Sequence, residues 1–235
     1  MAQNYGSRVQ FISENWGDSK LAARFGLKRY PAVFVNDVLL ARPEDFGWFG
    51  ENARYSWKDP ANPEKFKKDL ARLVNLELRG DTQGAQAAGT TSQEAPDLAR
   101  LPKLAMKDLQ GNAIDTSALD RKIVVVEFWA TWCVPCRSTL TWLNEMQRVH
   151  PGKLEIIGIA VESAEADVRK LTDPMQIGYH LVMGSDPMAL AFGDITSVPT
   201  MYIFDDSGKT ASIVYGAPED LHEKVGGTIE ALLKK

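Results

Sequence analysis

Two cysteines, the only ones in the chain, lie three positions apart at Cys133 and Cys136. A continuous apolar run from Ile123 to Val126 precedes them and predicts a buried strand, and a stretch with helical periodicity follows them. Disulfide exchange needs a thiolate on an accessible sulfur and a second thiol close enough to resolve the mixed disulfide. A cysteine pair between a strand and a helix therefore predicts a redox-active disulfide, Cys133–Cys136.

The helix expected behind the cysteines predicts the direction of attack. Because Cys133 would lie where this helix begins, unpaired backbone N–H groups and the positive end of the helix dipole face its sulfur. We therefore expect Cys133 to be the nucleophile and Cys136, one turn inside, to be the resolving thiol. Pro135 fits the first turn because it has no N–H to lose there and its φ is preset. An inert structural cysteine pair is the alternative.

Two other uses of a cysteine pair fail on spacing. Structural zinc needs about four ligands, and the three histidines, His150, His180 and His222, show no ligand spacing around the pair. Covalent haem attachment requires a histidine directly after the second cysteine, where this chain has Arg137. We therefore expect no metal, and no cofactor other than the disulfide itself.

Glu127 interrupts the most apolar of the expected strands. A carboxyl group buried in such a strand should have a raised pKa. It can then take the proton from Cys136 when that thiol attacks the mixed disulfide, which is a general-base role. The alternative is that Glu127 points to solvent past the edge of the sheet.

Composition and charge exclude several classes of protein. Of the 235 residues, 44% are apolar and 25% are charged, as in ordinary globular proteins of one or two domains. The formal net charge of -4 is too small to indicate binding of nucleic acid or of an anionic membrane. No stretch approaches the roughly 18 apolar residues of a membrane span, and the N-terminus lacks the apolar region of a secretory signal. A cytosolic protein, or the mature part of an exported one, would fit.

Residues 80–96 contain no large apolar residue, so they cannot bury enough surface to offset the entropy of ordering them. We predict a flexible linker there, between domains at 1–79 and 97–235.

In the second domain, strand and helix patterns alternate, which predicts an α/β fold with a central mixed sheet flanked by helices. The expected strands after a hairpin at about residues 104–114 are 123–129, 154–161, 179–183, 201–204 and 213–215, and the last helix is 221–233.

Residues 1–79 predict a smaller α/β lobe. We expect strands at 8–12 and 32–35, a helix at 20–25 between them, and a long helix from Asn62. An aromatic group is interpreted as part of the lobe's core, with a partner-binding surface as the alternative: Phe46, Trp48, Phe49, Tyr55 and Trp57.

Three motifs follow one another in the second domain: the Cys-X-X-Cys pair, Ser197-Val198-Pro199-Thr200, and an Asp-Asp-Ser-Gly-Lys turn from Asp205. Together they make residues 101–235 resemble the TlpA/ResA-like thiol-disulfide oxidoreductases, which have a thioredoxin fold. The resemblance implies an extracytoplasmic, periplasmic location, because such proteins usually act there, often in cytochrome c maturation.

The resemblance also implies functions for particular residues. Pro199 matches the family's cis-proline, which lies against the cysteine pair and leaves the backbone at Val198 free to pair with an extended substrate; Thr200 follows it as in the family. An ordinary trans proline at the start of a strand is the alternative. Trp132 resembles the exposed indole beside the nucleophile, and Glu127 matches the family's buried acid. The expected substrate-binding residues are Trp132, Val134, Pro135, Val198, Pro199 and Thr200.

Residues 8–36 resemble the C-terminal half of a thioredoxin fold: a strand, a short helix, and Tyr30-Pro31 before a second strand. The half that bears the cysteine pair is absent, so residues 1–79 would form an incomplete, cysteine-free lobe with Tyr30-Pro31 as a silent counterpart of the cis-proline. An unrelated α/β lobe is the alternative. An unpaired sheet edge in such a half-fold must be covered by the second domain, by another chain or by further residues of this protein.

The resemblance implies an enzyme, a thiol-disulfide oxidoreductase. Val134-Pro135 places no cation between the cysteines, where one would stabilise the thiolate and make the disulfide more oxidising. We therefore expect reduction of protein disulfides, with a protein thiol or disulfide substrate and an upstream thiol electron donor as partners.

Two alternatives remain. Peroxiredoxins share the fold but use a Thr/Ser-X-X-Cys motif; a binding module would dock a partner on the N-terminal lobe.

Overall fold

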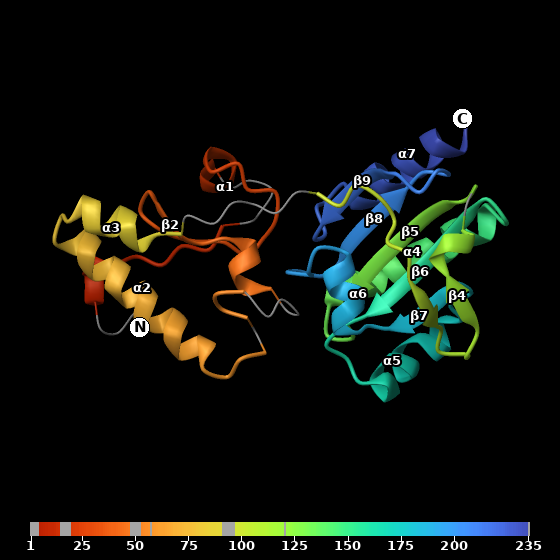
Figure 1. Cartoon of the computed structure of the whole chain (residues 1–235), viewed down its shortest axis with the longest axis horizontal. Helices are drawn as coiled ribbons and strands as arrows, with labels where there is room; N and C mark the ends of the chain where they lie inside the picture. Colours follow the sequence, from red (N-terminus) through yellow and green to blue (C-terminus); the bar gives the residue numbers. More distant parts are fainter. Residues whose placement is uncertain are drawn as a thin grey trace. The chain divides into compact units, whose positions relative to one another are not determined.

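A computed structural model describes residues 5–14, 20–47, 53–56, 58–90, 97–119 and 121–234 of the chain (Figure 1). The chain divides into two compact units, Met1–Ala95 and Pro96–Lys235, called here the first and second units. Within these described ranges, no helix is both long enough and apolar enough to cross a membrane. All of the predicted redox residues belong to the second unit.

The structure describes a five-stranded sheet in the second unit, in the order β7-β6-β5-β8-β9. β5, β6 and β7 run parallel, whereas β8 and β9 are antiparallel to their neighbours. The mixed sheet predicted from the alternation of strands and helices is therefore confirmed. Its strands are β5 (Ile123–Trp129), β6 (Leu154–Ala160), β7 (His180–Met183), β8 (Thr200–Phe204) and β9 (Thr210–Tyr215).

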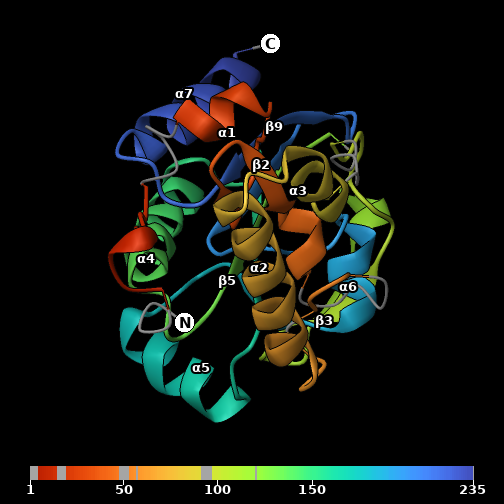
Figure 2. The same cartoon turned by 90° about the vertical axis from the view of Figure 1, so that its left-hand side faces the viewer.

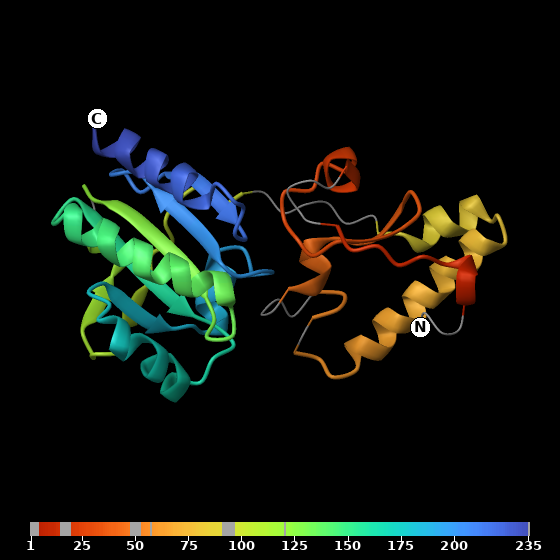
Figure 3. The same ribbon diagram turned by 180° about the vertical axis from the view of Figure 1, so that it is seen from behind.

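Helices cover both faces of this sheet (Figures 1 and 3). On one face, Val125 and Trp129 of β5 share an apolar cluster with residues of α4, α5 and α7. On the other face, the ring of Phe128 packs 5.1 Å from that of Phe192, directly after α6. β5 is buried at every position as a result. The helices are α4 (Val134–Val149), α5 (Glu165–Thr172), α6 (Asp186–Ala191) and α7 (Leu221–Leu233), with a 3₁₀ helix, η6, at Asp173–Met175.

A separate hairpin precedes the sheet in the sequence, as predicted. β3 (Ala105–Lys107) pairs antiparallel with β4 (Ala113–Asp115), and a 3₁₀ helix, η5 (Thr116–Ala118), follows. The hairpin's turn lies beside β7, because the N–H of Leu109 donates to the carbonyl of Leu181 at 2.8 Å.

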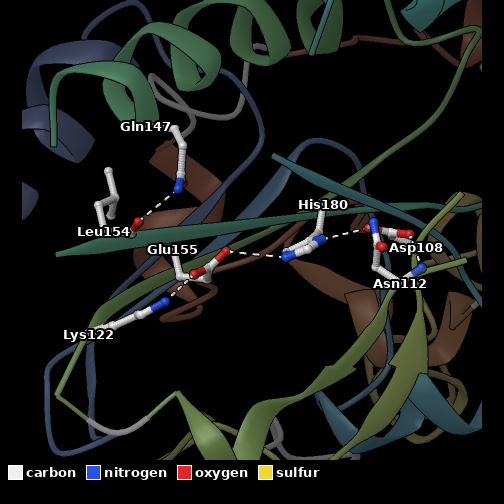
Figure 4. A network of polar contacts seen from close by, with 7 residues as sticks. All are labelled: Asp108, Asn112, Lys122, Gln147, Leu154, Glu155 and His180. Atoms are coloured by element: carbon white, nitrogen blue, oxygen red, sulfur yellow. Dashed lines mark hydrogen bonds and ion pairs between the residues drawn. The ribbon is translucent and has the colours of Figure 1, made fainter. Parts of the chain in front are cut away.

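A network of charged side chains attaches this turn to the sheet (Figure 4). Asp108 accepts hydrogen bonds from the N–H groups of Gln110 and Asn112 at 3.0 and 2.7 Å. Its Oδ2 lies 2.8 Å from Nδ1 of His180 on β7, whose Nε2 is 3.6 Å from Oε1 of Glu155 on β6. Burial would raise the pKa of Asp108, but the bonds from Asn112 and His180 outweigh burial and hold the pKa below its ordinary value.

The first unit contains a two-stranded sheet and the helices packed on it. β1 and β2 are antiparallel and meet at Asn36, which has a positive φ of 49°. The Tyr30–Pro31 peptide bond before β1 is cis. The likeness of this unit to half a thioredoxin fold stays a prediction. Its elements are α1 (Lys20–Arg24), β1 (Val33–Val35), β2 (Val38–Ala41), α2 (Asn62–Leu78) and α3 (Thr82–Ala88), with 3₁₀ helices η2 (Gly6–Arg8) and η4 (Pro43–Phe46).

The aromatic group of the first unit contributes to its core where the structure describes it. The rings of Phe46 and Tyr55 are buried, and both pack against Phe66 of α2 at 5.6 and 5.1 Å between centroids. The remaining members of the predicted group, Trp48, Phe49 and Trp57, lie outside the described residues.

α3 corrects the prediction that residues 80–96 form a flexible linker. The carboxylate of Asp81 caps this helix by accepting from the N–H of Gly84 at 2.8 Å. Ala85 is buried in a cluster with Leu40 and Leu73, and α3 lies beside α2 (Figure 2). A small side chain makes this contact, which is why the absence of large apolar residues was misleading. Residues 91–96 of the predicted linker lie outside the described part of the chain.

The strand predicted at residues 8–12 is also wrong. Arg8 ends the 3₁₀ helix η2, and residues 9–14 form neither helix nor strand. An alternating pattern favours a strand only when one face becomes buried. Phe11 and Ile12 are both exposed, so this segment gains no such burial.

Replacing Asp108 tests how firmly the hairpin is attached. Asp108→Ala removes the buried carboxylate that accepts from the N–H groups of Gln110 and Asn112, and hydrogen bonds to a charged group are the stronger ones, so the free energy of unfolding should fall by about 1–3 kcal/mol at pH 7. The folded-state pKa of Asp108 lies below its unfolded value of about 3.9, so its contribution is complete above that pH and lost as the pH falls through the folded-state pKa. Urea denaturation at pH 7 and at pH 2.5–3 (roughly one unit below that unfolded value) should therefore show a smaller difference in acid.

Asp37→Ala is the matched control for this measurement. Asp37 is exposed and paired with Arg24 on the surface, where an ion pair contributes roughly 0–1 kcal/mol. An equal decrease in the free energy of unfolding of the two variants at pH 7 would contradict a stabilising network at the hairpin.

Candidate redox site

The cysteine pair spans the junction between β5 and α4. Cys133 and Cys136 form a disulfide with 5.3 Å between their Cα atoms. Cys133 is the N-cap residue of α4, and its Sγ accepts a hydrogen bond from the N–H of Cys136 at 3.3 Å. The first turn of the helix thus presents an N–H donor and its positive dipole end to this sulfur, an arrangement that stabilises a thiolate.

The two sulfurs differ in access. Cys133 is 5% exposed and Cys136 is fully buried. The neighbours of Cys133 lie at the surface: Trp132 is 55% exposed, and Val134 and Pro135 are exposed as well. Exposed apolar side chains therefore lie beside Cys133 in the sequence, and Cys133 is the cysteine that keeps some exposed area.

The loop before β8 lies at the same end of the sheet. The Val198–Pro199 peptide bond is cis. Thr200 begins β8 opposite Phe128 of β5, so Pro199 lies near the position where β5 leads into the cysteines. Val198 packs against the apolar cluster that contains both cysteines, and Thr200 Oγ1 donates to the carbonyl of Ser197 at 2.8 Å. Residues far apart in the sequence are brought together here.

Glu127 is fully buried in β5, not at a sheet edge. Burial raises the pKa of Glu127 to about 8, and a hydrogen bond from Thr139 offsets part of this rise. Its Oε2 has no hydrogen-bond partner among the residues that the structure describes. The nearby Tyr179 is buried, which raises its pKa, and the charge of Glu127 raises it further. A carboxyl group in this setting can exchange a proton near neutral pH.

Sequence reasoning missed two groups that position the site. Thr139 contacts Glu127 from α4, and its spacing of three from Cys136 could have revealed it, because residues i and i+3 share a helix face. Ser163 accepts a hydrogen bond from the N–H of Thr131 at 2.9 Å and donates to the carbonyl of Val161 at 2.9 Å. It links the loop before the cysteines to the end of β6, a contact with no local signal in the sequence.

Known proteins are similar to the second unit of this chain. The AhpC/TSA family model matches residues 93–213. The thiol-disulfide oxidoreductase ResA of Bacillus subtilis (strain 168) is 26% identical over 116 residues, 49% of this chain and 65% of that protein. The thioredoxin-like protein YneN of the same strain is 28% identical over 156 residues, 64% of this chain and 91% of that protein. A solved structure of a thiol:disulfide interchange protein from Chlorobium tepidum TLS is 25% identical, with a TM-score of 0.51, and covers 60% of this chain and 99% of that one.

The second unit has the fold and the Cys-X-X-Cys site of the thioredoxin-like thiol-disulfide oxidoreductases, the class predicted from the motifs. The chain belongs to the AhpC/TSA family.

The ionisation of Glu127 predicts how stability depends on pH. Its folded-state pKa of about 8 lies above the unfolded value of about 4.3. The protonated group therefore contributes fully to the free energy of unfolding below a pH of about 4.3. That contribution is lost as the pH rises toward the folded-state pKa. Glu127→Gln has no group that ionises here, so its stability does not fall in this way as the pH rises. The free energy of unfolding of the variant minus that of wild type should therefore increase by up to about 1.4 kcal/mol for each pH unit between about 4.3 and about 8.

Urea denaturation of both proteins at several pH values measures this difference. Glu145→Gln is the matched control, since Glu145 is an exposed residue of α4 that pairs with Arg148. A difference between Glu127→Gln and wild type that does not change with pH would mean that Glu127 ionises as an ordinary carboxyl.

Proposed function

We propose that this protein is a thiol-disulfide oxidoreductase that reduces protein disulfides through a cycle of the Cys133–Cys136 pair. The observation that carries the proposal is the asymmetry of the pair: Cys133, which caps α4, keeps a small exposed area, whereas Cys136, one turn inside, is fully buried. The proposed cycle needs no further cofactor, because the dithiol form of the pair supplies the two electrons and becomes the Cys133–Cys136 disulfide.

The first step is attack by Cys133 on a substrate disulfide. Its thiolate is stabilised by the helix N-terminus and by the N–H of Cys136. The S–S bond of the substrate breaks as a bond forms between one substrate sulfur and Cys133. The other substrate sulfur leaves as a thiolate, so a mixed disulfide results.

The second step releases the reduced substrate. Glu127 takes the proton of Cys136, and the resulting thiolate attacks Cys133 and displaces the second substrate sulfur. The substrate has gained two electrons, and the protein is left with the Cys133–Cys136 disulfide. An upstream dithiol then reduces this disulfide and completes the cycle.

Substrate recognition is proposed to use the surface around Cys133. Trp132 and Val134 offer exposed apolar contacts on one side. On the other side, the backbone at Val198, beside the cis peptide bond to Pro199, can pair with an extended polypeptide. The hydroxyl of Thr200 holds this loop through its bond to Ser197.

The direction of the reaction follows from the charges near the pair. Val134 and Pro135 place no cation between the cysteines, so nothing in that dipeptide stabilises the dithiol form in the way that makes a strong oxidant. We propose a reduction potential well below the roughly -120 mV of a strong oxidant of this fold, and equilibration with a glutathione redox buffer would measure it.

Partners and location are part of the same proposal. The partners are a protein with an accessible disulfide, an upstream thiol donor, and a protein docked on the first unit. An extracytoplasmic location is supported by the resemblance to TlpA/ResA-like proteins.

Trapping the mixed disulfide tests the assignment of the two cysteines. In Cys136→Ser the second step is blocked, so incubation with oxidised insulin should leave insulin attached to Cys133 in a species that dithiothreitol releases. Cys133→Ser should form no such species, and both variants should lose turnover of insulin reduction by at least roughly a hundredfold. Mass spectrometry identifies the attached sulfur.

A peroxide assay with wild type separates the alternatives. Ala130 occupies the position three residues before Cys133, where a peroxidatic motif has threonine or serine. Rapid consumption of hydrogen peroxide without insulin reduction would assign a thiol peroxidase. Inactivity in both assays, with a partner bound to the first unit, would favour a binding module.

Replacing the proposed base tests the second step. Glu127→Gln keeps a neutral group of the same shape, so the fold should persist while insulin reduction slows by about 10²–10⁴-fold. In wild type the rate should rise with pH as Glu127 ionises, around a pKa of about 8, and this rise should be absent in the variant. Equal rates and equal pH profiles in the two proteins would remove Glu127 from the mechanism.

A further inference from the structure

Thr139 stands between the buried acid and the resolving cysteine. It is buried on α4, and its Oγ1 contacts Oε1 of Glu127 on β5. The same Oγ1 lies 2.8 Å from the main-chain carbonyl oxygen of Cys136. Buried threonines in helices commonly bond only to a carbonyl in the preceding turn, as Thr172 does to Val168 at 2.9 Å. The carboxyl contact is what sets Thr139 apart.

Counting protons makes this arrangement informative. A threonine hydroxyl has one proton to donate, and a carbonyl oxygen can only accept. If the hydroxyl of Thr139 donates to the carbonyl of Cys136, its oxygen must accept a proton from the carboxyl of Glu127, which is then the neutral acid. If Glu127 is ionised, the hydroxyl can donate its proton to the carboxylate or to the carbonyl, but not to both.

We propose that Thr139 is a positioning residue that serves Glu127 in both charge states, donating to the Cys136 carbonyl while Glu127 is protonated and to the carboxylate once Glu127 has ionised. The inference rests on the proposed function, in which Glu127 takes the proton of Cys136. When that proton arrives, the acid donates to Thr139 again and the bond to the Cys136 carbonyl is restored. The hydroxyl thus links the proton on Glu127 to the backbone of the resolving cysteine.

The energetic consequence has a definite sign. A hydrogen bond to a charged group is stronger than one between neutral groups. Removing the hydroxyl therefore destabilises the ionised form of Glu127 more than the protonated form. The pKa of Glu127 should therefore rise further in a variant without the hydroxyl. This agrees with the effect of Thr139 in the intact protein, where its bond offsets part of the rise that burial causes.

The other groups around Glu127 do not provide the same link. In the sheet, its register partners are Gly158 on β6 and Met201 on β8, which carry no charge. Tyr179, directly before β7, is titratable, but burial raises its pKa first and Glu127 raises it further, so it stays neutral where Glu127 ionises. α4 carries three exposed charged residues, Arg137, Glu145 and Arg148, and the buried Cys136, which is oxidised in the disulfide form.

The test compares Thr139→Val with Thr139→Ser in the full chain. Carbon-13 NMR of the glutamate carboxyl carbons follows the titration of Glu127 in the disulfide form, in which the cysteines do not titrate. Thr139→Val keeps the shape without the hydroxyl, so the Glu127 titration should move to higher pH, by about tenfold in its proton affinity. The rise of insulin reduction with pH should move with it, and the rate at pH 7 should fall by about three- to tenfold. Thr139→Ser should restore both.

Thr172→Val is the matched control, because it removes a buried helical hydroxyl that bonds only to a main-chain carbonyl. It should leave the Glu127 titration at its wild-type pH. The inference is overturned if Thr139→Val leaves the titration unmoved or lowers it, or if Thr139→Ser fails to restore it. Should Thr139→Val not fold, Thr139→Ala gives the same comparison. Wild type that fails to reduce insulin overturns the proposed function alone, since the NMR titration reports on Thr139 without any substrate.

Discussion

β5 is buried on both faces from Ile123 to Trp129, and a carboxyl group lies in its middle. Backbone groups of such a strand are satisfied by the neighbouring strands, here β6 on one side and β8 on the other. The side chain of Glu127 has no such guaranteed partner, and an ionised carboxylate there would be costly. Protonation and the contact with Thr139 both reduce the energetic cost of burying this group. Because burial raises its pKa to about 8, the group can exchange a proton near neutral pH.

The redox pair depends on the same strand. Because β5 is fixed on both edges, its C-terminal end delivers Cys133 to the beginning of α4 in one position. The loop that contains the cis Val198–Pro199 bond reaches the same place because β8 is antiparallel to β5 and therefore begins where β5 ends. The cysteine pair and the Val198–Pro199 loop are consequently close to each other at one end of the sheet.

The first unit is held together differently. Its two-stranded sheet is too small to bury a core alone, and the packing of α2 and α3 supplies the missing apolar surface. Ala85 of α3 shows how much a small residue can contribute when Leu40 and Leu73 surround it. Such contacts depend on shape, so composition alone underestimates them.

The sequence by itself determined the chemistry and the class of fold. A close cysteine pair after an apolar run, with Val198-Pro199 later in the chain, is a local pattern, and local patterns survive in the folded protein because strand and helix periodicity act over a few residues. The acid in the strand was visible for the same reason. Only the tertiary structure decided that residues 82–88 form a packed helix, that residues 9–14 do not join a sheet, and that Thr139 contacts Glu127. Each of these depends on which surfaces meet, and burial against a distant element leaves no periodic signal in the sequence.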